Sequence, residues 1–289
     1  MNIKEEERII KKSFYIVFLF SLFYYFIGLI SIGNFITAEQ NVIYYGALLE
    51  RGIPRLTGAV VNTNFLAIFA TFFFFFFTAK NRKTLAVLSL FLILLTFSRG
   101  AILSIVMGML ITYLILFPKK FFKPILYVIF LLTFVFVIYL LNSDFIVFDM
   151  IEKRLIQQGT SGRLDYWVNA INIFLINPFL GTGIHTSLIL NEMHYLHNTY
   201  LDILLDIGFL GFSFYIIVQL IILIDMFLHC KKYKMDWYVV AIFISLIISN
   251  IFLSAVISEF YFLIIAYYTA IKIRREKYET KCFNVNNGQ

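Results

Sequence analysis

The architecture of this chain is decided by the stretch LAVLSLFLILLTFSRGAILSIVMGMLITYLILF, residues 85–117. Two apolar arms lie on either side of the charged turn Ser98-Arg99-Gly100. As one helix the stretch would be about 50 Å long, which exceeds the ~30 Å hydrocarbon core of a bilayer. As two helices, each arm reaches about 20–26 Å, and Arg99 then lies just below one membrane surface. The stretch therefore predicts two short membrane helices joined at Arg99.

The composition also indicates a membrane protein. Of 289 residues, 61% are hydrophobic and 14% are charged, and the mean hydropathy is +0.86. A water-soluble domain of this length does not need such long apolar runs without charge. The net charge of +7 could suggest nucleic-acid binding, but the basic residues cluster between the apolar runs. That arrangement is typical of cytoplasmic membrane loops, so we expect no nucleic-acid partner.

Apolar runs and basic clusters together predict an all-α, polytopic integral membrane protein with about eight transmembrane helices. The expected spans are Ser13–Gly33, Asn62–Thr78, Leu85–Phe97, Ala101–Phe117, Ile125–Leu141, Leu201–Leu228, Trp237–Ser254 and Phe260–Ile273. Eight crossings put every basic cluster on one side, which the positive-inside rule makes the cytoplasm: Lys4–Lys12, Lys80–Lys83, Lys119–Lys123, Lys231–Lys234 and Lys272–Lys277. Both termini are then cytoplasmic. Residues 1–289 form one membrane domain, within which residues 142–200 form a long extracytoplasmic loop.

Three local features are interpreted within this topology. The N-terminal run has only a weak cleavage site at Ile36-Thr37-Ala38, so we expect a retained helix instead of a signal peptide. The run Phe72–Phe77 is most simply lipid-facing. Cys230 and Cys282 fall in cytoplasmic segments, where thiols stay reduced, so no disulfide is expected.

Arginines stand out on the predicted outer side, because the outer loops otherwise carry little positive charge. They include Arg55, Arg99, Arg154 and Arg163. Arginine forms bidentate contacts with phosphate oxygens, so several of them around a membrane-surface hollow predict a polyanionic head group such as a lipid diphosphate. The alternative is pairing with lipid phosphates or with Glu39, Glu50, Asp144 or Asp165. Pairing alone is least attractive for Arg99, because a charge near the bilayer costs roughly 2.5 kcal/mol or more.

The long loop contains a predicted interfacial helix. Thr160 or Ser161 would cap it, Arg163 would stand at its N-terminus, and apolar residues recur at helical spacing up to Asn177-Pro178. This pattern predicts an amphipathic helix in the outer interface with Trp167 at head-group depth. A helix N-terminus is itself a favourable anion site. Pro178, Gly181 and Gly183 are interpreted as a turn, because no strand precedes their Gly-x-Gly.

Three histidines, His185, His194 and His197, follow this turn. A metal site at His194 and His197 is an alternative, but their order does not match a zinc motif and we expect no metal. A histidine as general base fits better, because its ordinary pKa allows proton uptake near neutral pH. Asn198, Asp202 and Asp206 share one face of the next helix, and Arg99 or Arg163 could pair with the acids. Gly208 and Gly211 would permit close approach of a second helix. The simpler alternative is that His197 only caps this helix.

These residues carry a family resemblance. The chain resembles the O-antigen ligase/polymerase superfamily of bacterial membrane glycosyltransferases. The family's pattern of His, then Asn/Ser/Gln, nine residues, Gly, two residues and Gly matches His197-Asn198, Gly208 and Gly211. Its Arg-x-x-x-Trp and Pro-x-x-Gly-x-Gly elements resemble Arg163, Trp167, Pro178, Gly181 and Gly183. Its Thr-x-Ser-Arg-Gly turn and Arg-x-x-Gly and Asn-x-Asn elements match Thr96, Ser98, Arg99 and Gly100, and Arg55, Gly58, Asn62 and Asn64.

The resemblance runs from about residue 50 to residue 273. Family members usually have around a dozen crossings, so this chain is expected to lack several N-terminal helices. The resemblance implies an enzyme that uses glycans carried on undecaprenyl diphosphate, at the outer face of the cytoplasmic membrane, without metal or cofactor. Other membrane proteins of polysaccharide assembly are candidate partners beside the lipid bilayer.

The chemistry of the residues themselves agrees with this implication and suggests a role for each. His197 would accept the proton of the acceptor hydroxyl, Arg163 and Arg99 would hold the diphosphate, and direct attack would invert the anomeric centre. Contacts to the substrate are expected from Arg55, Asn64, Asn198, Trp167 and Asp206. We favour a polymerase of surface or capsular polysaccharide over a ligase. The Phe-, Ile-, Lys- and Asn-rich composition suits an AT-rich Gram-positive bacterium, in which a lipid A acceptor is absent.

Two other classes of protein stay open. A transporter of lipid-linked glycans would carry charges inside several helices, whereas the unusual charges here collect at one face. A catalytically silent membrane subunit is the second alternative. Both should tolerate His197→Ala, whereas an enzyme should not.

Overall fold

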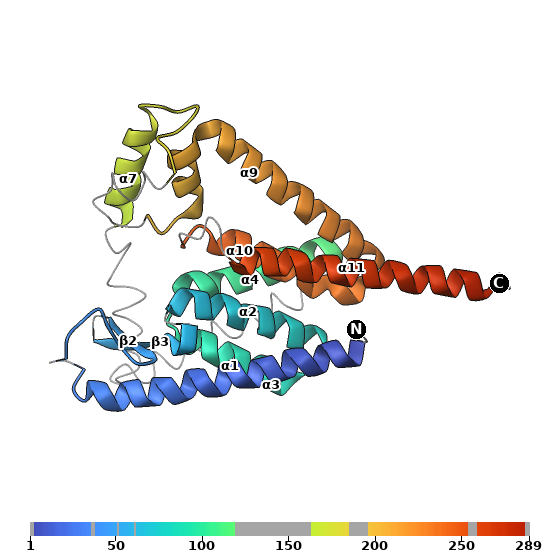
Figure 1. Ribbon diagram of the computed structural model, residues 1–289, viewed down its shortest axis with the longest axis horizontal. Coiled ribbons are helices and arrows are strands. Elements are labelled where there is room, and N and C mark those ends of the chain that lie inside the picture. The colour runs from blue at the N-terminus through green and yellow to red at the C-terminus, as the bar shows by residue number, and fades with distance from the viewer. Residues whose placement is uncertain are drawn as a thin grey trace.

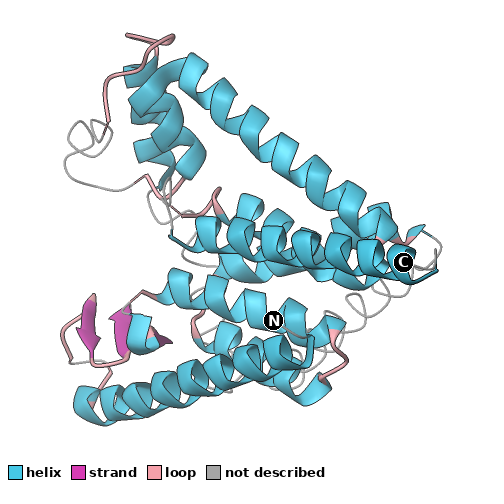
Figure 2. Ribbon diagram, turned by 45° about the vertical axis from the view of Figure 1, so that its right-hand side comes forward, coloured by secondary structure: helices cyan, strands magenta, loops and turns pink. Residues whose placement is uncertain are grey.

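The computed structural model describes residues 3–35, 38–50, 52–60, 62–118, 163–184, 196–253 and 259–286. In these ranges the molecule is a bundle of helices with one small sheet (Figures 1 and 2). The elements are α1 (Ile3–Ile32), β1 (Val42–Tyr44), β2 (Ala47–Glu50), β3 (Ile53–Leu56), η1 (Gly58–Val60), α2 (Thr63–Ala79), α3 (Lys83–Leu95), α4 (Arg99–Leu116), α7 (Arg163–Phe174), α9 (Thr199–Lys232), η4 (Lys234–Asp236), α10 (Trp237–Ser249) and α11 (Glu259–Asn286).

The apolar helices are those of a membrane protein. Three of them are long and apolar enough to cross a bilayer: Lys4–Ile32, Arg99–Leu116 and Thr199–Lys232. The helices α2 and α3 are apolar but shorter. Seven predicted spans fall on α1, α2, α3, α4, α9, α10 and α11, and the span Ile125–Leu141 lies outside the described residues. Eight crossings therefore stay a prediction.

The stretch that decided the architecture forms two helices, as predicted. The helix α3 ends at Leu95 and α4 begins at Arg99. Small residues then bring α4 against α10. A Cβ atom on Gly108 would lie 2.0 Å from the Ser245 hydroxyl, and that hydroxyl donates to the Ser104 carbonyl at 2.9 Å. Close packing through small residues is typical of membrane helices.

The Phe72–Phe77 run is buried in the protein, so its interpretation as lipid-facing is wrong. Phe75, Phe76 and Phe77 are each 0% exposed, and only Phe74 is partly buried. The rings pack edge-on against aromatic residues of other helices, among them Phe14, Trp237, Tyr238 and Tyr267. Offset and edge-on aromatic pairs add about 0.5–1.5 kcal/mol each beyond the area they bury. The run therefore forms the core between α1, α2, α10 and α11.

The prediction of an all-α chain is wrong in one respect, because the structure contains a small β-sheet. Its three antiparallel strands have the order β1-β2-β3, with Val42 opposite Leu49 and Leu48 opposite Arg55. Glycine lets it approach α1 closely, since a Cβ atom on Gly28 would lie 2.2 Å from the Tyr44 carbonyl oxygen. The Tyr25 hydroxyl, also on α1, donates to the Pro54 carbonyl at 2.9 Å.

The bundle has two distinct ends. We call the end that holds the sheet and the first residues of α2, α4 and α9 the sheet end. The opposite end, the basic end, holds Lys4–Lys12, Lys80–Lys83, Lys231–Lys234 and Lys272–Lys277, and both chain termini point there (Figure 1). Ion pairs join these clusters: Arg82 with Glu7, Arg274 with Glu6, Lys232 with Glu279, and Arg275 with Asp236. Four basic clusters thus gather at one end, as expected, and Lys119–Lys123 lie outside the described residues.

Candidate functional site

The beginnings of α2 and α4 are tied together at the sheet end. The Asn62 side-chain oxygen caps α2 by accepting from the backbone N–H groups of Asn64 and Phe65, at 2.9 and 3.2 Å. Asn64, a predicted substrate contact, accepts a hydrogen bond from the Ser98 hydroxyl at 3.0 Å. This bond connects the Asn-x-Asn motif directly to the turn that carries Arg99. Arg99 is half-buried and is the first residue of α4.

The His197-Asn198 segment begins α9, but the capping residue is Asn198. Its buried side chain accepts from the backbone N–H groups of Tyr200 and Leu201, at 3.0 and 3.2 Å. The simpler alternative, in which His197 caps the helix, is therefore wrong. His197 is half-buried and has a φ of 53°. A left-handed backbone at a non-glycine residue is uncommon and costs free energy unless its surroundings hold it.

Thr199 fastens the His197 segment to the end of α10. Its backbone N–H donates to the carbonyls of Asn250 and Leu253 at 2.8 and 3.0 Å, and its hydroxyl donates to Leu253 at 2.5 Å. The Tyr200 hydroxyl donates to the Ile247 carbonyl at 2.8 Å. These two residues are not predicted from the sequence, because contacts to backbone carbonyls leave no spacing pattern. We therefore count Thr199 among the residues that build the site.

The Arg99 turn meets the same segment after α10. A Cβ atom on Gly100 would lie 2.8 Å from the Phe252 Cβ, so only glycine permits this approach. A hollow of about 20 Å³ remains between Asn64, Ser98, Gly100, Phe252 and Leu253. That volume holds about one water molecule. The junction is therefore closely packed and has no room for a molecule much larger than water.

Trp167 supports the other side of the His197 segment. Its indole N–H donates to the carbonyl of Leu196 at 2.9 Å. The expected amphipathic helix is present as α7, and it packs on the start of α9 through Ala170, Leu196 and Leu205. His197 is thus held on one side by Trp167 and on the other by Thr199. The expected caps Thr160 and Ser161 lie outside the described residues.

The two glycine motifs are halves of one backbone junction. The helix α9 covers the predicted span Leu201–Leu228, but it is broken at Gly208, which has φ 65° and ψ −171°. The segment Pro178–Gly183 forms the expected turn and fills this break. Four backbone bonds join the two segments: Thr182 to Leu205 (2.9 Å), Gly183 to Asp206 (2.9 Å), Phe209 to Pro178 (2.8 Å) and Leu210 to Phe179 (3.3 Å). A Cβ atom on Gly208 would lie 2.4 Å from the Phe179 oxygen.

Arg55 lies inside the protein. It is 6% exposed, its Nη1 pairs with Glu50 at 2.5 Å, and its Nε donates to the Thr96 carbonyl at 2.9 Å. These contacts support the alternative of an ion pair at this arginine. The bond to Thr96 also joins the sheet to the turn that carries Arg99.

Two arginines of the sheet end stand at the positive ends of helix dipoles. Arg99 begins α4, and Arg163 begins α7. A cation at a helix N-terminus faces the positive end of the dipole, so this placement is unfavourable unless an anion joins it. The side chain of Arg163 lies outside the described residues. Asp206 is half-buried, and its backbone carbonyl belongs to the Gly208 junction.

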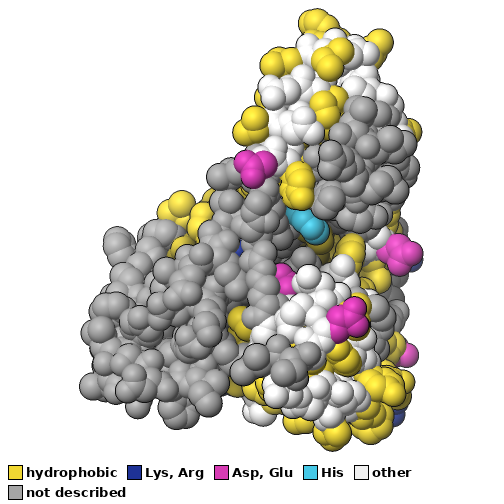
Figure 3. Space-filling model, turned by 90° about the vertical axis from the view of Figure 1, so that its left-hand side faces the viewer, with side chains coloured by type: hydrophobic (Ala, Val, Ile, Leu, Met, Phe, Trp, Pro, Cys, Tyr) yellow, Lys and Arg dark blue, Asp and Glu magenta, His cyan; other side chains and the backbone are white. Residues whose placement is uncertain are grey.

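Figure 3 looks onto the sheet end. A histidine side chain lies at the surface near the middle of this face, with hydrophobic side chains above and below it. In the described part of the chain, no group of three or more His, Cys, Asp or Glu side chains is placed to hold a metal ion.

Comparisons with known proteins bear on the same segments. The sequence profile of a family described as O-antigen ligase matches residues 84–216. This range includes the Arg99 turn, α7, the His197-Asn198 segment and the Gly208 junction. No curated protein is significantly similar to the chain. The profile match supports membership of the O-antigen ligase/polymerase superfamily.

Proposed function

We propose that this protein is a polymerase-type glycosyltransferase that joins oligosaccharide repeat units carried on undecaprenyl diphosphate at the outer face of the cytoplasmic membrane. One observation carries the proposal. The His197 segment and the Arg99 turn are both fastened to the residues that follow α10, through Thr199 and Gly100. A candidate base and a candidate diphosphate ligand therefore share one end of the bundle, where the N-termini of α2, α4 and α9 favour an anion.

In the proposed reaction, a hydroxyl of the acceptor glycan attacks the anomeric carbon of the donor. The new carbon–oxygen bond forms as the bond between that carbon and the diphosphate oxygen breaks, and the electron pair leaves with the diphosphate. His197 accepts the hydroxyl proton, and Arg99 and Arg163 offset the charge on the leaving group. Attack from the face opposite the diphosphate inverts the anomeric centre. The proposal includes no metal or cofactor.

The remaining predicted residues divide into two groups. Asn64 and Asn198 use their side-chain oxygens within the protein, so their amide N–H groups donate to sugar hydroxyls in this proposal. Asp206 is a further candidate sugar contact. Trp167 and Arg55 bind backbone carbonyls beside the site, and we assign them positioning roles.

Transfer to a different acceptor is the second candidate, since the matched family is described as O-antigen ligase. The two activities differ in product. A polymerase gives a ladder of chain lengths on the lipid carrier, whereas a ligase moves a finished glycan to another molecule. Analysis of carrier-bound and carrier-free glycan from the same cells distinguishes them.

The test compares glycans on cells that carry wild type, His197→Ala, Arg99→Ala or Arg82→Ala at matched membrane levels. Arg82 is a control arginine, half exposed at the basic end and paired with Glu7. Loss of a general base typically costs about 10²–10⁴-fold, and loss of one electrostatic contact to the developing charge costs about 10²–10³-fold. His197→Ala and Arg99→Ala should therefore leave single repeat units, and Arg82→Ala should give long chains. If His197→Ala and Arg99→Ala make wild-type chains, the catalytic proposal is wrong. A transporter or a silent subunit is then the better account.

A further inference from the structure

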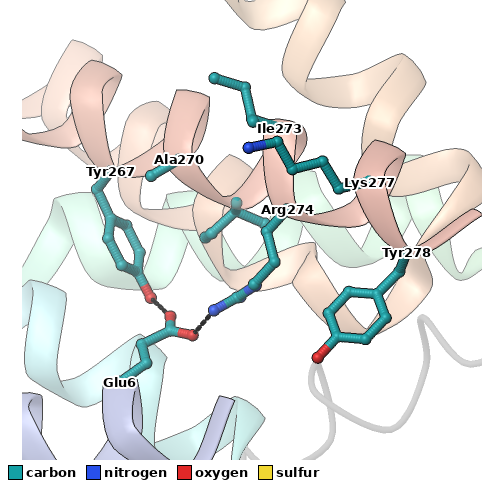
Figure 4. A pocket seen from close by; sticks show the side chains of 8 residues that line it. Glu6, Tyr267, Ala270, Ile273, Arg274, Lys277 and Tyr278 are labelled. Carbon is teal, nitrogen blue, oxygen red and sulfur yellow. Dashed lines mark hydrogen bonds and ion pairs between the residues drawn. The ribbon is translucent and has the colours of Figure 1, made fainter. Parts of the chain in front are cut away.

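A pocket of about 590 Å³ lies between α1 and α11 at the basic end, which is opposite the sheet end. Figure 4 shows the side chains that line it. Glu6 of α1 lies on one side, and seven residues of α11 between Tyr267 and Tyr278 line the other. Ligand pockets in proteins usually measure about 300–1,000 Å³. The pocket is therefore large enough for a bound molecule of moderate size.

The polar groups that line this pocket include cationic donors without a partner among the described residues. Glu6 accepts from the Tyr267 hydroxyl at 2.5 Å and forms an ion pair with Nη1 of Arg274 (Figure 4). Among the described residues, the buried Nε of Arg274 has no hydrogen-bond partner and Lys277 has no acidic partner. The other cations of this turn are paired, Lys272 with Asp225 and Arg275 with Asp236. With one acid and two cations, the lining carries a net positive charge.

The pocket is also partly apolar. Ala270, Ile271 and Ile273 belong to its lining, and Ile273 is 47% exposed. Most of the lining area thus belongs to carbon atoms, whereas Arg274 and Lys277 contribute the unpaired donors. A ligand that matches this surface has an anionic group at one end and a hydrocarbon part at the other.

The position of the pocket along α1 and α11 corresponds to the head-group layer of a membrane. Glu6 lies seven residues before the apolar run that starts at Ser13, which is about 10 Å along a helix. Lys277 lies four residues after the apolar run that ends at Ile273, or about 6 Å. The head-group region extends about 5–8 Å beyond the hydrocarbon core on each side. The cations Arg274 and Lys277 are therefore at phosphate level, with Glu6 just beyond it and with Ala270 and Ile273 toward the acyl chains.

We propose that this pocket binds one acidic phospholipid of the leaflet that surrounds the basic end. The lipid phosphate contacts Lys277 and the Nε of Arg274, and its acyl chains lie along Ala270 and Ile273. Anionic lipids are attracted to basic pockets between membrane helices on the cytoplasmic side. The bound lipid would join α1 to α11 beside the Glu6–Arg274 ion pair. This site is independent of glycan transfer.

The test uses the full chain, purified in detergent and stripped of lipid, with native mass spectrometry as the readout. Phosphatidylglycerol is the anionic probe, and phosphatidylcholine is the zwitterionic control. We expect one phosphatidylglycerol to bind at least about tenfold more tightly than phosphatidylcholine, because two unpaired donors contact it. Lys277→Gln should weaken that binding about fivefold. Ala270→Phe, at an exposed position, should weaken it by narrowing the pocket.

Lys234→Gln is the matched control, since Lys234 is an exposed lysine at the same end that does not line the pocket. It should bind phosphatidylglycerol like wild type. Equal binding of the two lipids would overturn the proposal. Equal loss in Lys277→Gln and Lys234→Gln would do so too, because it would indicate diffuse charge attraction. Displacement of the lipid by equimolar glycerol phosphate would show a site for small anions only.

Discussion

At the scale of single residues, the two turns of the candidate site share an unusual backbone. Phe97 and His197 both have left-handed φ angles, of 49° and 53°, and each precedes the N-cap residue of a helix, Ser98 or Asn198. Such residues cost of order 1–3 kcal/mol and persist only where neighbouring contacts hold them. At His197 those contacts come from Trp167 and Thr199. A strained backbone held by specific contacts in this way motivates the hypothesis that the His197 turn is functional.

Gly208 is the residue at which a substitution should damage the site most without touching a proposed catalytic group. Its φ and ψ lie in a region that is essentially restricted to glycine, and a Cβ atom would overlap the Phe179 oxygen at 2.4 Å. We expect Gly208→Ala to destabilise the protein by about 1–3 kcal/mol or more. Thermal unfolding in detergent and glycan chain length are the measurements.

Gly33→Ala is the control for this prediction. Gly33 also has a positive φ, 64°, but nothing lies within 4 Å of an added Cβ atom. The control should therefore cost clearly less than Gly208→Ala. Equal effects of the two substitutions would mean that the junction with Pro178–Gly183 does not hold α9.

At the scale of elements, α2 is held by protein contacts on the side of its phenylalanine run. Phe76 is fully buried and lies edge-on to Tyr238, at 5.6 Å between ring centroids. Removal of a buried phenylalanine typically costs about 3–5 kcal/mol, so Phe76→Ala should unfold at a markedly lower temperature. The measurement is the thermal midpoint of the detergent-solubilised protein.

Phe74→Ala is the matched control in the same helix, since Phe74 is only partly buried. It should lower the midpoint less than Phe76→Ala. Equal losses of stability in the two variants would contradict the larger packing contribution assigned to Phe76.

At the scale of the whole molecule, a buried ion cluster at the basic end ties three elements together. Asp236 of η4 accepts two hydrogen bonds from Arg275 of α11 at 2.9 Å and contacts His229 of α9 at 3.2 Å. Burial raises the pKa of Asp236, but the hydrogen bonds of His229 and Arg275 outweigh it and lower the pKa to about 2. The carboxylate therefore stabilises the folded state above its ordinary pKa of 3.8.

This depressed pKa predicts a pH dependence. The contribution of Asp236 is fully present near neutral pH, and it is lost as the pH falls from about 5 toward 2. The shift corresponds to about 2 kcal/mol of stability. Unfolding followed across this range should show that loss in wild type and a flatter profile in Asp236→Asn. Glu279→Gln, which removes an exposed partner of Lys232, should keep the wild-type profile. A wild-type profile in Asp236→Asn would refute the assignment.

The sequence predicts the helices and the basic end better than it predicts the packing, the sheet and the break in α9. Apolar runs and basic clusters correctly indicate helices and a single basic end, and charge at Arg99 predicts the turn between α3 and α4. Hydropathy cannot separate lipid from protein as the partner of Phe72–Phe77, because lipid tails are as apolar as leucine. Strands of three or four residues give too little alternation to predict the sheet. The break at Gly208 depends on hydrogen bonds between backbones, which no side-chain pattern records.

The Gly208 junction has a consequence for how proteins of this kind can diversify. Its four bonds use only backbone atoms, and the side chains of Phe179 and Leu180 beside it are 66% and 69% exposed. In this segment the backbone atoms therefore form the junction, and the side chains determine the chemistry of the surface. Substitution of these exposed side chains would therefore change the surface beside α9 without rebuilding the backbone junction that fixes the break at Gly208.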